Sequence, residues 1–215
     1  IRWKHPTKGM IMPGAFIPVF EKNGFIGKVD YYMWDKVCQW LRKRMDEGHE
    51  SIPVSVNVSR VNMYNPNLVD ILTALVKKYD IPPELLNLEI TESAYMDSPG
   101  VMEKTVTELQ EKGFLILMDD FGSGYSSLNT LKNIPVDVLK IDINFMSGVE
   151  NQRRSECILA SIIRMAGWLE PPVVMEGVET AEQVDFLKSI GCGYVQGFYY
   201  ARPMPQNEYE DLING

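Results

Sequence analysis

The sequence is poor in the residues that carry many common active sites. Its 215 residues include three cysteines and two histidines. The cysteines show none of the paired spacings of a zinc site or a disulfide framework, and their odd number fits a reducing compartment. With so few histidines, neither a histidine-based catalytic triad nor a histidine-rich metal cluster is expected.

Long apolar runs and excess positive charge are also lacking. No apolar run reaches the roughly 18 residues of a membrane span, and no signal peptide is visible. We therefore expect a cytoplasmic location, while the parent protein could still be tethered to a membrane. The formal net charge is −8, so binding to duplex nucleic acid is not expected. An anionic substrate is not excluded, because clustered carboxylates bind cations that reverse the local field.

The size and composition of the chain predict one globular domain. Hydrophobic residues make up 45% and charged residues 23%, an ordinary globular mixture. No low-complexity linker interrupts residues 1–215. Because the chain opens at Ile1 without a methionine, we expect it to be a piece of a longer protein.

Short apolar runs alternate with helical patterns, which is typical of parallel strands covered by helices on both faces. After an irregular opening, strands are predicted at 52–58, 85–90, 114–118, 136–141, 173–175 and 194–200. Helices are predicted at 29–45, 66–79, 101–112, 126–132, 154–168, 180–190 and 208–213. Such a repeat fits either an open doubly wound sheet or a closed barrel.

Each of the six apolar runs that mark these strands ends on a polar or ionisable residue. These residues are Asn57, Glu89, Asp119 with Asp120, Lys140, Glu176 and Gln196. In a closed barrel the chemistry lies at the C-terminal ends of the strands, whereas an open sheet concentrates polar residues near one switch point. Polar groups after every strand therefore favour the barrel.

Asp119 and Asp120 are the strongest local signal. Adjacent carboxylates repel unless a cation or a proton lies between them, and Mg²⁺ and Mn²⁺ prefer oxygen ligands. With Asn57, Glu89 and Glu176 the set has more oxygen donors than one hydrated Mg²⁺ usually takes from protein, so it favours two ions. For the aspartate pair alone, a turn or helix cap is an equally good interpretation.

Lys140 interrupts an apolar strand, so it is either paired with a carboxylate or functional. It could orient an attacking water or neutralise a phosphoryl oxygen, and Asp142 would share its face if the strand continues. The loop at 121–127 is rich in glycine and hydroxyl groups, but it lacks the ending of a Walker phosphate-binding loop.

With these residues identified, the chain resembles the EAL-domain phosphodiesterases, which hydrolyse the bacterial second messenger cyclic di-GMP. Ordered motifs carry the resemblance along the whole chain. They are Ile-Arg-Trp at 1–3, Val-Asn-Val-Ser at 56–59, Leu-Glu-Ile-Thr-Glu at 88–92, Asp-Asp-Phe-Gly-Ser-Gly-Tyr-Ser-Ser-Leu at 119–128, Leu-Lys-Ile-Asp at 139–142, Glu-Gly-Val-Glu-Thr at 176–180 and Gln-Gly-Phe-Tyr-Tyr-Ala-Arg-Pro-Met-Pro at 196–205.

The resemblance implies a role for each matched residue. Asn57, Glu89, Asp119, Asp120 and Glu176 would be ligands of two Mg²⁺ or Mn²⁺ ions, with Asp119 bridging them. Asp120 and Glu176 would also take part in catalysis, together with Lys140 and Gln196, which would contact the nucleophilic water or its surroundings. Arg2 and Pro203 would bind substrate, and Glu92 would hold the loop at 121–127.

The resemblance also implies the architecture and partners. The expected fold is a modified TIM-type (β/α)8 barrel, here strands 3–8, because the first strand, most of the second and the glutamate that names the family would precede Ile1. A homodimer and an upstream regulatory or GGDEF-type domain are expected partners. The expected reaction is metal-assisted hydrolysis of cyclic di-GMP to linear pGpG. The alternatives are an inactive cyclic di-GMP sensor, or an Mg²⁺-dependent barrel enzyme with another substrate.

Overall fold

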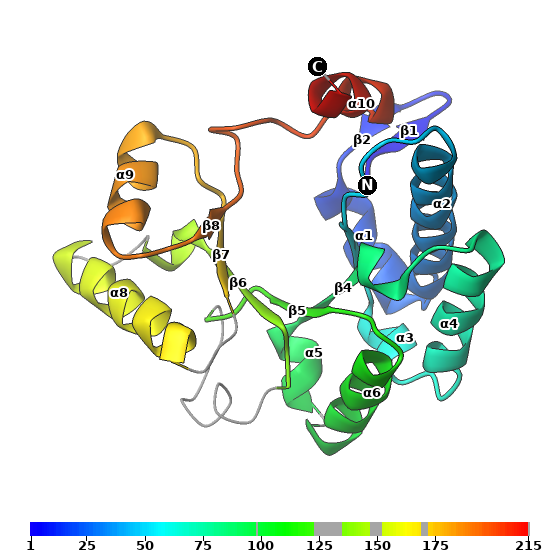
Figure 1. Cartoon of the computed structure of the whole chain (residues 1–215), viewed down its shortest axis with the longest axis horizontal. Coiled ribbons are helices and arrows are strands. Elements are labelled where there is room, and N and C mark those ends of the chain that lie inside the picture. The colour runs from blue at the N-terminus through cyan, green and yellow to red at the C-terminus, as the bar shows by residue number, and fades with distance from the viewer. Residues whose placement is uncertain (98, 123–134, 147–151, 169–171, 215) are drawn as a thin grey trace. The chain divides into compact units, whose positions relative to one another are not determined.

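The computed structural model describes residues 1–97, 99–122, 135–146, 152–168 and 172–214 (Figure 1). These residues form two compact units. Unit 1 comprises Ile1–Asp119 and Asn133–Asp137, and unit 2 comprises Asp120–Lys132 and Val138–Gly215.

Unit 1 contains three parallel strands, an antiparallel hairpin and the helices around them. In chain order its elements are β1 (Trp3–His5), β2 (Gly9–Ile11), α1 (Pro13–Lys22), α2 (Ile26–Asp46), β3 (Val54–Asn57), α3 (Arg60–Met63), α4 (Leu68–Tyr79), the 3₁₀ turn η1 (Pro83–Leu85), β4 (Leu86–Thr91), α5 (Glu92–Asp97), α6 (Pro99–Glu111) and β5 (Ile116–Asp119).

Unit 2 repeats the alternation of strand and helix. Its described elements are β6 (Val138–Asp142), the 3₁₀ turn η2 (Ile143–Met146), α8 (Gln152–Trp168), β7 (Val173–Glu176), α9 (Ala181–Ser189), β8 (Tyr194–Val195) and α10 (Gln206–Asn214). The helix predicted at 126–132 lies outside the described residues.

The strands of unit 1 bury one face, and the other face is polar apart from the buried Leu117. β3 pairs in parallel with β4, and β4 pairs in parallel with β5. Leu88, Ile90 and Met118 are fully buried on one face, and helix α2 contacts both β3 and α4. Since alternate residues point to opposite faces of a strand, the residues between them form a second face, which carries the polar side chains.

Unit 2 follows the same plan. β7 pairs in parallel with β6 on one side and with β8 on the other. Ile141 and Met175 are fully buried, as is Leu159 of α8, the helix that contacts β7. Helix α9 begins with a capping box, in which Thr180 accepts from the backbone of Gln183 while the Gln183 side chain accepts from the backbone of Thr180.

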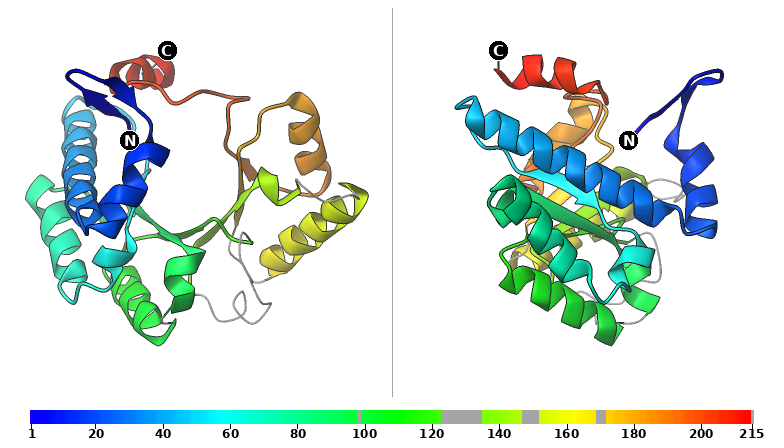
Figure 2. Two further views of the ribbon diagram at one scale, coloured as in Figure 1. Left: turned by 180° about the vertical axis from the view of Figure 1, so that it is seen from behind. Right: turned by 90° about the vertical axis from the view of Figure 1, so that its right-hand side faces the viewer.

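The prediction of an irregular opening was wrong. Residues 3–11 form the β1–β2 hairpin and residues 13–22 form α1, although Pro18 lies inside this helix. Trp3 of the hairpin packs against Phe16 and Phe20 of α1, with ring centroids 5.8 and 5.9 Å apart, and Figure 2 shows these elements beside one another. This aromatic packing offsets the backbone hydrogen bond that a helical proline removes.

The last predicted strand is shorter than expected. β8 contains two residues, and the chain then turns, with the Tyr200 N–H donating to the Gly197 carbonyl. The sequence did not predict the short helices α3 and α5, which follow β3 and β4. Among the described residues, no helix combines the length and apolar character needed to cross a membrane.

Candidate functional site

Three predicted ligands lie on the polar face of unit 1. Asn57 is paired in register with Glu89, and Asp119 with Thr91. Because Glu89 and Thr91 are two residues apart, their side chains share a face, and Asn57 and Asp119 share it with them. Asn57 is exposed, while Glu89 and Asp119 are half-buried. The sequence therefore placed these three residues correctly on one side of neighbouring strands.

The strand predicted at 85–90 ends one residue later than expected. β4 continues to Thr91, so Glu89 lies two residues before the C-terminal end. The period of two preserves the face, and Val58 just beyond β3 donates its N–H to the Glu89 carbonyl at 2.8 Å. Glu89 is thus level with the last residue of β3, which keeps it beside Asn57.

The two adjacent aspartates have different backbone settings. Asp119 is the last residue of β5. Asp120 has a φ of 56°, the left-handed region that few residues other than glycine adopt. Aspartate tolerates this conformation better than most residues do, so Asp120 fits the predicted turn. The turn and metal-ligand interpretations are compatible, because the turn removes Asp120 from strict strand alternation.

Lys140 and Glu176 form a buried ion pair in unit 2. The Lys140 Nζ lies 2.9 Å from Glu176 Oε1, and the side chains are 5% and 18% exposed. Lys140 does not end its strand as predicted, because β6 continues to Asp142, which is in register with Glu176. Asp142 shares the face of Lys140, and its Oδ1 accepts from the Asn144 N–H at 2.7 Å. Of the two interpretations of Lys140, paired with a carboxylate or functional, the structure shows the pairing.

Gln196 directly follows β8, and its backbone is fixed on both sides. Its N–H donates to the Met175 carbonyl at 2.7 Å, and its carbonyl accepts from the Val178 N–H at 3.1 Å. The next residue is Gly197, where a Cβ would collide with the backbone of Val178. Only glycine, which has no Cβ, allows the backbones to approach so closely. This packing, together with the two backbone hydrogen bonds, holds Gln196 beside the C-terminal end of β7.

The remaining predicted residues are Glu92, Arg2 and Pro203. Glu92 begins α5 and is 4% exposed; most of the loop it was predicted to hold lies outside the described residues. Arg2 and Pro203 are exposed, and Arg2 donates to the Ile1 carbonyl at 2.8 Å.

A second group of residues, which sequence reasoning missed, holds the end of β3. Asp30 of α2 is 5% exposed, and its Oδ2 accepts from the Ser59 N–H and from Asn62 Nδ2, both at 2.8 Å. Burial raises the pKa of Asp30, although the donors of Ser59 and Asn62 oppose the shift. The available signal was that Asp30 lies between Ile26 and Trp34 on the apolar stripe of α2.

The donors on the polar face of unit 1 fit a hard divalent cation. Glu89 and Asp119 supply carboxylates and Asn57 an amide oxygen, which are the ligands that Mg²⁺ and Mn²⁺ prefer. In unit 2, a carboxylate such as Glu176 has about four acceptor positions, so pairing with Lys140 is compatible with metal ligation. Within the described part of the chain, no three His, Cys, Asp or Glu side chains group closely enough to hold a metal ion.

Comparison with known proteins identifies relatives over the whole chain. A family model described as "EAL domain" matches residues 1–203. The chain is 36% identical over 208 residues to the bifunctional diguanylate cyclase/cyclic di-GMP phosphodiesterase MucR of Pseudomonas aeruginosa. The matched region covers 97% of this chain and 30% of MucR. The chain is 32% identical over 216 residues to the cyclic di-GMP phosphodiesterase RocR of the same species, covering 100% of the chain and 54% of RocR. The chain therefore spans between about a third and a half of these relatives.

Solved structures give the same result. The phosphodiesterase of PaMucR in complex with c-di-GMP matches with a TM-score of 0.90 and 36% identity, over 97% of this chain and 84% of that one. The EAL enzyme Bd1971, in its cAMP- and cyclic-di-GMP-bound form, matches with a TM-score of 0.90 and 26% identity, over 99% and 58%. This likeness confirms the predicted fold class, a modified TIM-type (β/α)8 barrel.

Proposed function

The chain belongs to the EAL domain family, and we propose that it hydrolyses cyclic di-GMP to linear pGpG in a reaction that depends on Mg²⁺ or Mn²⁺. The relatives MucR and RocR are named as cyclic di-GMP phosphodiesterases. The observation that supports the proposal most strongly is the shared face of Asn57, Glu89 and Asp119, whose oxygen donors match the chemistry that such a reaction needs.

We assign the metal ligands to Asn57, Glu89, Asp119, Asp120 and Glu176. Four carboxylates and one amide are enough for two hydrated ions, and Asp119 is the assigned bridging ligand. A bound divalent cation polarises a phosphoryl oxygen and lowers the pKa of a bound water.

The reaction itself is a simple displacement. Water adds to phosphorus, the bond from phosphorus to the 3′-oxygen breaks, and that oxygen takes up a proton. Lys140 donates an N–H to orient the water or neutralises a phosphoryl oxygen, while Glu176 keeps the ammonium in place through the 2.9 Å contact. Gln196, whose backbone is fixed on both sides, accepts a hydrogen bond from the water through its side-chain amide.

Substrate binding and assembly complete the proposal. Arg2 contacts a substrate phosphate, for which a guanidinium is well suited, and Pro203 contacts another part of the substrate. Glu92 holds the loop at 121–127. The intact protein acts in the cytoplasm as a homodimer, and an upstream regulatory or GGDEF-type domain controls it.

The test is the turnover of cyclic di-GMP by the intact protein carrying Asp119→Asn. This change keeps the side-chain volume and removes the charge of the bridging ligand, so we expect Mg²⁺-dependent formation of pGpG to be lost. Asp185→Asn, a matched change at an exposed position of α9, should leave turnover unchanged. Wild-type turnover in Asp119→Asn would refute the assignment. If the wild-type protein binds cyclic di-GMP without cleaving it, the chain is instead a sensor.

A further inference from the structure

We propose that Asp30 and Trp34 of helix α2 are positioning residues for the candidate metal ligand Asn57. They fix the backbone at the C-terminal end of β3, so that the Asn57 amide is held ready for a cation. This inference rests on the proposed function, because it assumes that Asn57 is a ligand.

Trp34 holds the residue itself. Its side chain is fully buried, and its indole N–H donates to the Asn57 carbonyl at 3.0 Å. A buried indole N–H normally finds an acceptor, and here the acceptor is the backbone of the ligand residue. The contact joins α2 to the last residue of β3.

Asp30 holds the chain two residues further on. Its Oδ2 accepts from the Ser59 N–H at 2.8 Å and from Asn62 Nδ2 at 2.8 Å. Asn62 of α3 is itself buried and also donates to the Gly27 carbonyl of α2 at 3.3 Å. A carboxylate this deeply buried is costly unless hydrogen-bonded, so the network fixes the turn between β3 and α3 to helix α2.

The neighbouring strand holds the residue between them. The Val58 N–H donates to the Glu89 carbonyl at 2.8 Å. Three consecutive residues, at 57, 58 and 59, are therefore each fixed through a backbone group, two by α2 and one by β4. With its backbone fixed in this way, the Asn57 side chain can move only by rotation about its own side-chain torsions.

Asn57 needs this support more than the acidic ligands do. An amide oxygen carries no net charge, so its contribution to metal binding depends on its placement. Removing partners that orient metal ligands typically costs about 10- to 100-fold in metal affinity. If Asp30 had a purely structural role, replacing it would lower the stability of the fold and leave the metal affinity unchanged.

The experiment measures Mn²⁺ affinity by the electron paramagnetic resonance of free Mn²⁺, with intact protein and no substrate. Asp30→Ala should weaken Mn²⁺ binding about tenfold. Asp30→Asn, whose amide oxygen can accept the same two bonds, should stay within about threefold of wild type. Asn57→Ala is the reference for loss of the ligand itself.

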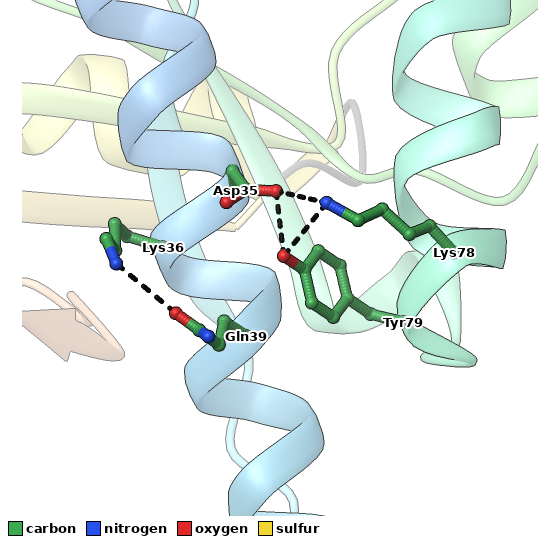
Figure 3. A network of polar contacts seen from close by, with 5 residues as sticks. All are labelled: Asp35, Lys36, Gln39, Lys78 and Tyr79. Carbon is green, nitrogen blue, oxygen red and sulfur yellow. Dashed lines mark hydrogen bonds and ion pairs between the residues drawn. The ribbon is translucent and has the colours of Figure 1, made fainter.

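Asp35→Ala is the matched control. Asp35 lies on the same helix and also accepts two hydrogen bonds, but from Lys78 and Tyr79 of α4 (Figure 3). The Asp35→Ala substitution should lower the stability of the fold without changing its Mn²⁺ affinity. In turnover assays, Asp30→Ala should raise the Mn²⁺ concentration needed for half-maximal rate, while KM for cyclic di-GMP at saturating Mn²⁺ stays unchanged.

The outcomes separate the two proposals. If wild-type protein does not bind Mn²⁺, the proposed function fails. If wild type binds and folded Asp30→Ala binds equally well, the positioning role is overturned, as it is if Asp30→Asn loses as much affinity as Asp30→Ala. Should Asp30→Ala not fold, Asn62→Ala, which removes one of the two donors, serves instead: weaker Mn²⁺ binding supports the role, and unchanged binding overturns it.

Discussion

The Lys140 ammonium lies 2.9 Å from Glu176 Oε1, and both side chains are largely withdrawn from water. Burying two charges is costly, and their attraction offsets this cost only while both partners are present. The pair joins neighbouring strands of unit 2, since β6 and β7 are hydrogen-bonded in parallel.

Replacing only Lys140 should therefore be destabilising. Lys140→Met leaves the Glu176 carboxylate without its cation, and we expect the free energy of unfolding to fall by about 2–3 kcal/mol. The estimate is at the low end for a buried pair, because Glu176 keeps some contact with water. Chemical denaturation of the single variant measures it.

The double variant Lys140→Met/Glu176→Leu separates a structural pair from a functional one. Replacing both charges with apolar groups should recover most of the lost stability, while turnover should stay absent. Recovery of turnover together with stability would show that the pair is only structural, and it would refute the roles assigned to both Lys140 and Glu176.

A second prediction concerns the close approach that holds Gln196. Gly197→Ala adds a Cβ that would collide with the backbone of Val178, so we expect a loss of about 2 kcal/mol or more in the free energy of unfolding. Gly193→Ala is the matched control, because a Cβ there would meet nothing within 4 Å. Equal melting temperatures for the two variants would contradict the observed packing.

A third prediction uses the exposed network in Figure 3. Lys78 and Tyr79 beside Asp35 hold the pKa of this carboxyl below its usual value. A carboxyl whose folded pKa is depressed stabilises the fold above its unfolded pKa of about 3.9, and the contribution is lost as pH falls through the folded pKa. Asp35→Asn should thus be less stable than wild type at pH 7, and this difference in stability should shrink as the pH falls below about 4.

Urea unfolding of both proteins between pH 3 and pH 7 measures this difference. Tyr79→Phe removes one of the two donors to Asp35. In this background, the loss of stability caused by Asp35→Asn at pH 7 should be smaller. A gap between wild type and Asp35→Asn that stays constant down to pH 3 would show that the carboxylate does not stabilise the fold.

The faces of the strands were predictable from the sequence, but their ends were not. Glu89 and Lys140 look like strand ends because polarity begins there, yet β4 and β6 each continue two residues further. Parallel pairing with neighbours extends a strand past its apolar run. Since the side-chain period is two, the predicted face survived the error in length.

Other features depend on tertiary contacts that no local pattern shows. An irregular opening was predicted, whereas the packing of Trp3 on α1 maintains a helix there although it contains Pro18. Asp30 lies within the helix predicted at 29–45, and its hydrogen bonds join it to Ser59 and Asn62, which are about 30 residues away in the sequence. In both places tertiary packing outweighs local propensity.

We propose that this chain carries out metal-dependent hydrolysis of cyclic di-GMP, and product analysis after removal of the metal is the sharpest test of that activity. The intact protein is stripped of divalent cations with a chelator, supplied with cyclic di-GMP, and then given Mg²⁺ or Mn²⁺. We predict no product before the addition and linear pGpG after it. Formation of pGpG in the stripped protein, or none after either cation is restored, would contradict the account.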